Sequence, residues 1–312
     1  MPFRSRRSSV LSPGARVPSA AYETPGFRTH HPSPSGASSS FAWPRKKSMG
    51  RRSMWGQSDD SLATRYTESV RPKNGSTANI EPISDNTLFI SLNLSSPFLG
   101  DDRRNHTCPI LGVLPDPEHK SVQYGITPSV TRYEDMKFKT VREAVDFFHQ
   151  ILQGLEFMHE NYVAHRDCSS NNIAMLEGSN PPEYYLTISP ASRQYRADGG
   201  RPVAMPFWGN DKSVPEFQRS PTDPHDPFRA DVYTLGNMIR KDFVEVYSNL
   251  SFMEPLVTEM ISPDPARRPM MDEVIDRFTE DALRLSDRAF RQPLRRRWRH
   301  RFPLLFRDQR EH

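Results

Sequence analysis

The stretch Ala164–Asn172, which reads AHRDCSSNN, is the most informative part of this chain. It joins two apolar segments, because a long helical pattern ends just before it and a short strand-like run, Ile173–Leu176, begins just after it. The stretch is polar, and its His-Arg-Asp triplet is followed after four residues by Asn172. This pattern predicts a loop that presents functional side chains from a helical scaffold.

The helix before this loop is the clearest predicted element. Thr140 and Glu143 have the spacing of a capping box at its start. Apolar residues then recur at helical spacing, at Val141, Ala144, Val145, Phe148, Ile151, Leu152 and Leu155. The pattern predicts a helix over 141–160.

Shorter elements flank this helix and loop. Alternating Ile90, Leu92 and Leu94 indicate a strand, but the many leucines of 88–94 also suit a helix, and both structures stay open there. Short apolar runs predict strands over Cys108–Leu114, Val122–Ile126, Ile173–Leu176 and Tyr184–Ile188, of which the last two form a hairpin.

The remainder of the chain has mainly helical patterns. Gly199–Asp226 is rich in proline and glycine, which predicts a long loop. Helical spacing of apolar residues follows in three segments, Ala230–Asp242, Met253–Ile261 and Met271–Phe278.

Charge is distributed unequally along the 312 residues, although the net charge is only +4. Residues 1–80 hold 13 basic and 4 acidic side chains, residues 288–312 hold 9 and 2, and residues 81–287 hold 20 and 32. The first 80 residues are dominated by Ser, Pro, Gly and Arg, a composition that cannot bury enough apolar surface to offset chain entropy. We therefore expect an acidic folded part between disordered basic termini.

Cysteine content and hydropathy bear on the compartment. Cys108 and Cys168 are too few for a disulfide framework, so a reducing intracellular setting, cytoplasmic or nuclear, is expected. No stretch approaches the roughly 20 apolar residues that span a bilayer, and no continuous apolar segment follows the first arginines. These features predict a soluble protein without a transmembrane segment.

Four motifs follow one another in a fixed order. They are His165-Arg166-Asp167 with Asn172, then Val214-Pro215-Glu216, Asp231–Gly236 and Asp264–Pro269. In this order they resemble the catalytic loop, the A-P-E motif, the central buried helix and the D-P-x-x-R-P motif of protein kinases, and the chain is most similar to the fungal-type protein-kinase-like family. The resemblance covers roughly residues 84–280.

The resemblance implies an α+β fold with a mainly helical, kinase-like C-lobe, a reduced or partial N-lobe and disordered basic termini. The implied organisation is a disordered Ser/Pro/Arg-rich region over 1–80, a partial N-lobe and hinge over 81–139, the C-lobe over 140–285 and a basic tail over 286–312. It also implies a buried ion pair between Glu216 and Arg268. Small-molecule kinases that resemble aminoglycoside and choline kinases share an H-x-D-x-x-x-x-N loop, but Arg166 and the other motifs favour the protein-kinase branch.

In a protein kinase of this type, Asp167 would be the base that orients the attacking hydroxyl, and Asn172 would bind a magnesium ion. His165 and Arg166 would pack the loop and pair with the activation segment. The implied cofactors are ATP and Mg²⁺, and the implied substrate is a protein or peptide.

Several other parts of that chemistry have no counterpart in the sequence. The D-F-G position falls on Ile188-Ser189-Pro190, which supplies no metal-binding carboxylate. No G-x-G-x-x-G motif precedes residue 100, residues 86–100 contain no acid, and Ser169 stands where Ser/Thr kinases carry a lysine. The early lysines, Lys46, Lys47 and Lys73, lie in polar or proline-flanked contexts.

These gaps predict a pseudokinase-like protein that acts by protein interaction. The alternative is an active Ser/Thr protein kinase with unusual metal and nucleotide contacts. A third interpretation is a chain whose first 80 residues have replaced a normal N-lobe.

The basic termini suggest partners of their own. Ser8, Ser9, Ser48 and Ser53 follow basic residues, which suits basophilic kinases and phosphate-dependent adaptors. The tail from Arg295 to Phe306 mixes arginine with apolar residues and could bind an anionic membrane, nucleic acid or an import receptor, fold back onto the acidic part, or stay free.

Two more side chains have simple predicted roles. Cys168 lies next to Asp167, but no motif supplies it with a base, so a small packed residue is expected. Trp208 is expected to pack the segment before Glu216, with a peptide-docking role as the alternative.

Overall fold

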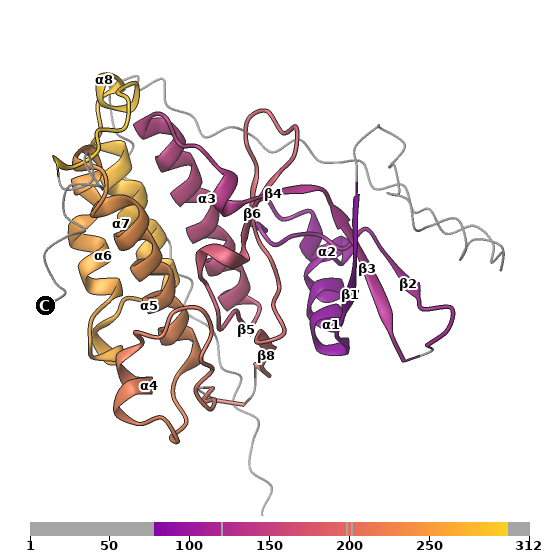
Figure 1. The fold of residues 1–312 in the computed structure, drawn as a ribbon. Helices are drawn as coiled ribbons and strands as arrows, with labels where there is room; N and C mark the ends of the chain where they lie inside the picture. Colours follow the sequence, from indigo (N-terminus) through magenta and orange to yellow (C-terminus); the bar gives the residue numbers. More distant parts are fainter. Residues whose placement is uncertain (1–77, 120, 198, 201, 299–312) are drawn as a thin grey trace, which may run out of the picture. The chain divides into compact units, whose positions relative to one another are not determined.

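An antiparallel three-stranded sheet begins the described part of the chain. The computed structural model describes residues 78–119, 121–197, 199–200 and 202–298. Strands β1 (Ala78–Ile83), β2 (Gly112–Pro115) and β3 (Gln123–Pro128) form a sheet in the order β1-β3-β2 (Figure 1). The predicted strand near 122–126 is confirmed, and the one predicted over 108–114 is shorter and begins at Gly112. The predicted disordered region 1–80 lies outside the described residues, apart from the start of β1.

The segment 88–94, for which strand and helix both remained open, is helical. Helix α1 (Asp85–Leu94) starts at Ser84, whose hydroxyl accepts a hydrogen bond from the Thr87 N–H at 3.3 Å. Ile90 and Leu94 are buried and Leu92 is exposed, because residues four apart share one face of a helix and residues two apart do not. One further turn, α2 (Pro97–Gly100), follows.

The predicted central helix is confirmed with its bounds, as α3 (Val141–Glu160). Half of its predicted capping box is present, since the Thr140 hydroxyl accepts from the Glu143 N–H at 3.3 Å. The other half is wrong, because the Glu143 carboxylate accepts from the Lys139 N–H at 2.6 Å instead of returning to Thr140. The apolar face of α3 is buried, and its Phe147 and Phe148 pack against Phe243.

A second antiparallel sheet holds the segments on either side of the candidate loop. Its strands are β4 (Val130–Arg132), β6 (Ile173–Leu176) and β7 (Tyr184–Leu186), in the order β4-β6-β7. The predicted β6–β7 hairpin is confirmed. A two-stranded ladder between β5 (Val163–Ala164) and β8 (Arg193–Gln194) lies directly before the loop.

The C-terminal half is mainly helical, and Figure 1 shows its long helix α7 (Met271–Leu283) running beside α3. The helices are α4 (Pro215–Arg219), α5 (Pro227–Ile239), α6 (Glu254–Met260), α7 (Met271–Leu283) and α8 (Asp287–Phe290), with a π-helix, η3 (Arg240–Val244), directly after α5. Short 3₁₀ turns are η1 (Tyr133–Asp135), η2 (Ser170–Asn172), η4 (Ser248–Met253) and η5 (Pro265–Arg267). The three predicted helices are confirmed. The predicted continuous loop over 199–226 is wrong at α4, where Pro215 occupies the first turn and favours helix initiation.

A buried ion pair joins α4 to the turn after η5. Arg268 is 1% exposed, and its guanidinium donates to both carboxylate oxygens of Glu216 at 2.8 and 2.6 Å. It also donates to the carbonyl oxygens of Arg229 and Ser262, and it lies 4.8 Å from the ring centre of Tyr233. The predicted Glu216–Arg268 pair is therefore confirmed, and two further N–H groups of Arg268 donate to neighbouring backbone.

The basic tail predicted over 286–312 is folded in its described part. Residues 287–298 form α8 and an extended segment that lies on the domain, so a free tail is wrong for these residues. Of the tail from Arg295 to Phe306, for which folding back was one of the alternatives, the described residues 295–298 lie on the domain. Its contacts are mainly backbone hydrogen bonds, rather than the charge attraction expected from the acidic composition of 81–287.

The described residues therefore form an α+β fold with small antiparallel sheets and a helical C-terminal half. In this part of the chain, no helix has both the length and the apolar character required to cross a bilayer.

Replacing Arg268 with Met should lower the free energy of unfolding by about 3–5 kcal/mol, because Glu216 would stay buried without its partner. Urea unfolding measures the loss. As a control, Arg284→Met removes a surface pair with Asp281 and should cost less than about 1 kcal/mol. An equally small loss for the Arg268 variant would contradict the structural role of the buried pair.

Candidate functional site

The loop that begins with His165 is held at both ends by regular structure. Strand β5 precedes it and pairs with β8, and η2 leads from it directly into β6. The short turn is closed by the Ser169 N–H, which donates to the Asp167 carbonyl at 2.8 Å, and by the Asn172 N–H, which donates to the Ser169 carbonyl at 3.0 Å. The sequence therefore places the loop between two anchored strands.

The carboxylate of Asp231, from helix α5, holds the first residues of the loop. One oxygen accepts from the His165 N–H at 2.7 Å, and the other accepts from the Arg166 N–H at 2.6 Å. His159 lies 3.1 Å from the same carboxylate, which is 1% exposed. Arg166 has a φ of 66°, in the left-handed region that a long side chain rarely adopts. Asp231 stabilises this strained residue by binding its N–H group.

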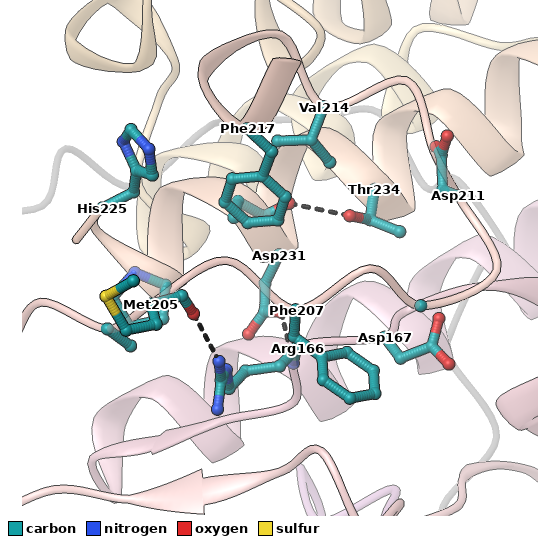
Figure 2. A pocket seen from close by; sticks show the side chains of 14 residues that line it. Arg166, Asp167, Met205, Phe207, Asp211, Val214, Phe217, His225, Asp231 and Thr234 are labelled. Carbon is teal, nitrogen blue, oxygen red and sulfur yellow. Dashed lines mark hydrogen bonds between the residues drawn. The ribbon is translucent and has the colours of Figure 1, made fainter. Parts of the chain in front are cut away.

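His165 and Arg166 pack the loop, as predicted. His165 is fully buried; its Nε2 lies 3.0 Å from the Thr187 carbonyl oxygen and its Nδ1 accepts from the Asp167 N–H at 3.3 Å. Burial lowers the pKa of His165, so its imidazole is neutral. Arg166 donates to the Met205 carbonyl at 2.7 Å and lies 5.7 Å from the ring centre of Phe207. Figure 2 shows this contact between the loop and the segment around Met205.

The carboxylate of Asp167 is enclosed by amide groups. Its Oδ2 accepts from the side-chain amides of Asn172 and Asn210, each at 3.0 Å. Its Oδ1 accepts from the Asn210 N–H at 3.1 Å. Both oxygens are therefore engaged, and Asp167 is 8% exposed.

Asn210 extends this arrangement to the rest of the loop. Its side-chain Nδ2 also donates to the Ser169 hydroxyl at 3.1 Å, and its side-chain Oδ1 accepts from the Asn171 side-chain amide at 2.9 Å. The preceding Gly209 lies so close that a Cβ there would be 2.5 Å from Oδ1 of Asp167. Only glycine leaves room for this approach. The absence of a side chain at Gly209 therefore allows the backbone of Gly209-Asn210 to lie against the Asp167 carboxylate.

A small pocket lies beside Asp167. Its lining residues come from the loop, from 204–225 and from α5, and they include Arg166, Met205, Phe207, Phe217 and His225 (Figure 2). Its volume of about 20 Å³ has room for little more than one water molecule. In this conformation the pocket does not admit a substrate side chain next to Asp167.

The segment at the predicted D-F-G position forms a serine turn. The Ser189 hydroxyl accepts from the Ala191 N–H at 3.2 Å, the Ser192 hydroxyl donates to the His165 carbonyl at 3.0 Å, and both serines are buried. No group of three or more His, Cys, Asp or Glu side chains in the described ranges could hold a metal ion. Asn172 directs its amide nitrogen at Asp167, so this site offers one enclosed carboxylate and one amide oxygen. These residues do not fit the magnesium centre that the motif implies.

The described strands before the loop supply no lysine for a nucleotide phosphate. Strands β1, β2 and β3 contain no lysine, and Lys46, Lys47 and Lys73 lie outside the described residues. Helix α1 contacts the segment beside the loop through Asn86, whose side-chain amide donates to the Ser192 carbonyl at 2.9 Å. This contact is made by a neutral amide and not by a carboxylate.

The two remaining predicted residues have packing roles. Cys168 is fully buried, and burial together with the negative charge of Asp231 raises the pKa of its thiol, so it is a packed thiol and not a nucleophile. Trp208 packs edge-to-face on Phe217 with ring centres 5.8 Å apart and remains partly exposed.

Sequence reasoning missed the roles of Asp231, Gly209 and Asn210. An acidic residue within the otherwise apolar pattern of α5 was a usable signal, because a buried carboxylate requires hydrogen-bond donors. The Gly-Asn dipeptide was a weaker signal, since it also suits an ordinary turn.

No known family model matches this chain.

Replacing Asp231 with Ala should lower the free energy of unfolding by about 3 kcal/mol or more, because two buried backbone N–H groups would lose their acceptor. Urea unfolding measures the loss, and hydrogen exchange should show faster exchange of the His165 and Arg166 amides. The exposed Asp223→Ala serves as the control and should change stability by no more than about 0.5 kcal/mol. Unchanged exchange at both amides would show that Asp231 does not hold the loop.

Replacing Gly209 with Ala should destabilise the protein by about 1–3 kcal/mol, because the new methyl group overlaps the Asp167 carboxylate and the segment must move. Hydrogen exchange at the Asn210 amide reports the movement directly. Gly199→Ala is the matched control, since its Cβ would meet only ordinary contacts. If both variants were as stable as the parent chain, the close approach of Gly209 to Asp167 would be refuted.

Proposed function

We propose that this chain is a protein-kinase-like domain of the fungal type in which phosphoryl transfer is weak or lost, and that it acts by protein interaction. The order of the four motifs supports the family. The contacts between them support it further, because Asp231 binds the backbone of the His-Arg-Asp loop and Arg268 pairs with Glu216.

The enclosure of the Asp167 carboxylate by amide groups is the main observation that supports the proposal of weak or lost phosphoryl transfer. A general base must lie about 2.6–3.2 Å from the proton it removes, directly or through one water. Both carboxylate oxygens of Asp167 instead accept hydrogen bonds from Asn172 and Asn210. A substrate hydroxyl could reach Asp167 only after Asn210 and Gly209 had moved away.

The composition of the site points in the same direction. The loss of one preorganised charge-stabilising group typically lowers the rate by about 10²–10³. Here the second metal carboxylate is replaced by the serine turn at Ser189, and the loop lysine by Ser169. Such losses are not additive, but two of them are enough to reduce transfer close to background.

An apolar segment beside the loop supports protein interaction. Val203, Met205, Phe207 and Trp208 are all exposed or partly exposed there. The segment is fixed, because Ala204 and His225 exchange two backbone hydrogen bonds of 2.8 Å and Arg166 binds the Met205 carbonyl. A fixed exposed apolar segment is typical of a protein-binding surface.

The second candidate is an active Ser/Thr protein kinase that uses ATP and magnesium. One observation favours it: Asp167 and Asn172 lie together, and the contacts that enclose Asp167 from the other side come from the single residue Asn210. Movement of that segment would expose the carboxylate.

Phosphate incorporation from magnesium-ATP separates the two candidates. The parent chain should transfer no more phosphate, to itself or to a generic Ser/Thr peptide, than its Asp167→Asn variant. Asn210→Ala, which removes the enclosing amide, should also remain at background, because the metal and lysine positions stay unfilled. Robust transfer by the parent chain that is lost in Asp167→Asn would establish the active kinase instead.

Nucleotide binding provides an independent measurement. A ligand present at 100 times its dissociation constant adds about 2.7 kcal/mol of stability, which is a clear rise in melting temperature. We expect magnesium-ATP to leave the melting temperature of this chain unchanged. A rise that requires Mg²⁺ and is lost in Asn172→Ala would contradict the proposal.

A further inference from the structure

The extended segment Gln292–Arg297, here called the strap, is pinned to two separate parts of the domain. At its start, the Val141 N–H donates to the Gln292 carbonyl at 3.0 Å, and the Leu294 N–H donates to the Lys139 carbonyl at 2.8 Å. The strap therefore satisfies a donor in the first turn of α3, where helices lack internal partners.

The end of the strap binds the segment between η3 and η4. The Ser248 N–H donates to the Arg295 carbonyl at 2.8 Å, and the Arg297 N–H donates to the Val246 carbonyl at 2.7 Å. Asn249 adds two side-chain hydrogen bonds of 3.0 Å, one to the Pro293 carbonyl and one from the Arg295 N–H. Backbone contacts at both ends fix the strap on the surface of the domain.

Pinning the strap fixes a concentration of positive charge. Residues 288–298 contain five arginines and no acid, whereas residues 81–287 hold 20 basic and 32 acidic side chains. Arg297 is used internally, because it donates to the Val244 carbonyl and pairs with Glu254. Arg291 reaches Asp287 only at 4.0 Å.

Three arginines remain available on the surface. Arg288, Arg295 and Arg296 are exposed, and none of them forms an ion pair with a carboxylate of the described residues. Two acids line a groove together with Arg296, and both are engaged, since Glu254 pairs with Arg297 and Glu245 pairs with Arg240. The guanidinium of Arg296 lies 5.9 Å from the ring centre of Tyr247, a contact that leaves its positive charge without a counter-ion among the described residues. All three guanidinium groups can therefore bind an external anion.

An exposed aromatic residue ends this basic surface. Trp298 is 66% exposed, and it borders a groove that Arg296 and Arg240 also line. The sequence continues with Arg299, Arg301 and the apolar residues of Phe302–Phe306. Arginine combined with exposed tryptophan and aliphatic residues fits the interface of an anionic bilayer, whereas aliphatic residues add nothing to binding of a nucleic acid backbone.

We propose that the strap surface, formed by Arg288, Arg295, Arg296 and Trp298, docks this domain on an anionic lipid surface. The excess of acidic side chains in 81–287 would orient the docked domain. An anionic membrane attracts the strap surface and repels the acidic remainder of the domain, so the strap surface would face the membrane. Each arginine near an anionic bilayer contributes a favourable interaction that salt screens over about 10 Å at 0.1 M.

The test is co-sedimentation of the full chain with phosphatidylcholine vesicles that contain about 30% phosphatidylserine. The parent chain should bind these vesicles, should not bind pure phosphatidylcholine, and should be released by about 0.5 M salt. The triple variant Arg288→Gln/Arg295→Gln/Arg296→Gln should lose vesicle affinity by a factor of about ten or more. Trp298→Ala should weaken vesicle binding severalfold while it retains the salt dependence.

A matched control separates the strap from net charge. The triple variant Arg103→Gln/Arg132→Gln/Arg267→Gln removes the same charge from exposed positions outside the strap and should bind as the parent does. Equal urea midpoints of the two triple variants would show that both fold. Equal vesicle binding by the two variants would overturn the proposal, because the other basic segments of the chain would then account for it. Strap-dependent binding to a single-stranded oligonucleotide without vesicle binding would overturn it in favour of nucleic acid.

Discussion

The carboxylate of Asp231 accepts hydrogen bonds from two consecutive backbone N–H groups of the candidate loop, and the other site contacts depend on that attachment. It holds Arg166 in a left-handed conformation, which in turn directs the guanidinium to the Met205 carbonyl. The segment that follows Met205 then reaches Asp167 through Gly209 and Asn210. A single buried acid on α5 therefore determines where the loop and its covering segment meet.

The contacts that preserve this architecture differ from those that a transfer reaction requires. Asp231 and the Glu216–Arg268 pair are buried and bind partners within the protein, so they stabilise the fold whether or not a nucleotide is present. The residues that would face a nucleotide or metal are a buried serine turn and neutral amides. In the proposed kinase-like domain, the residues that hold the fold are therefore separate from those that a transfer reaction would use.

Much of the C-terminal half could be predicted because its signals are local. The apolar spacing of 141–160 gave the bounds of α3, and the paired runs at 173 and 184 gave the hairpin. Helix α1 could not be decided, since Ile90, Leu92 and Leu94 satisfy both periods until burial selects the four-residue spacing. The enclosure of Asp167 was also beyond prediction, because Asn210 lies 43 residues away and only tertiary packing brings the two together. The strap was read as a tail for the same reason: its partners are backbone groups, and a sequence does not show those.

The strap also bears on how the domain is completed. Helix α3 begins at Val141, but the acceptor for its first N–H group comes from Gln292, which is translated much later. The first N–H groups of a helix have no partner inside the helix, so a chain that ended before residue 292 would leave the Val141 N–H to water. The start of α3 is therefore completed by a segment that lies about 150 residues further along the chain.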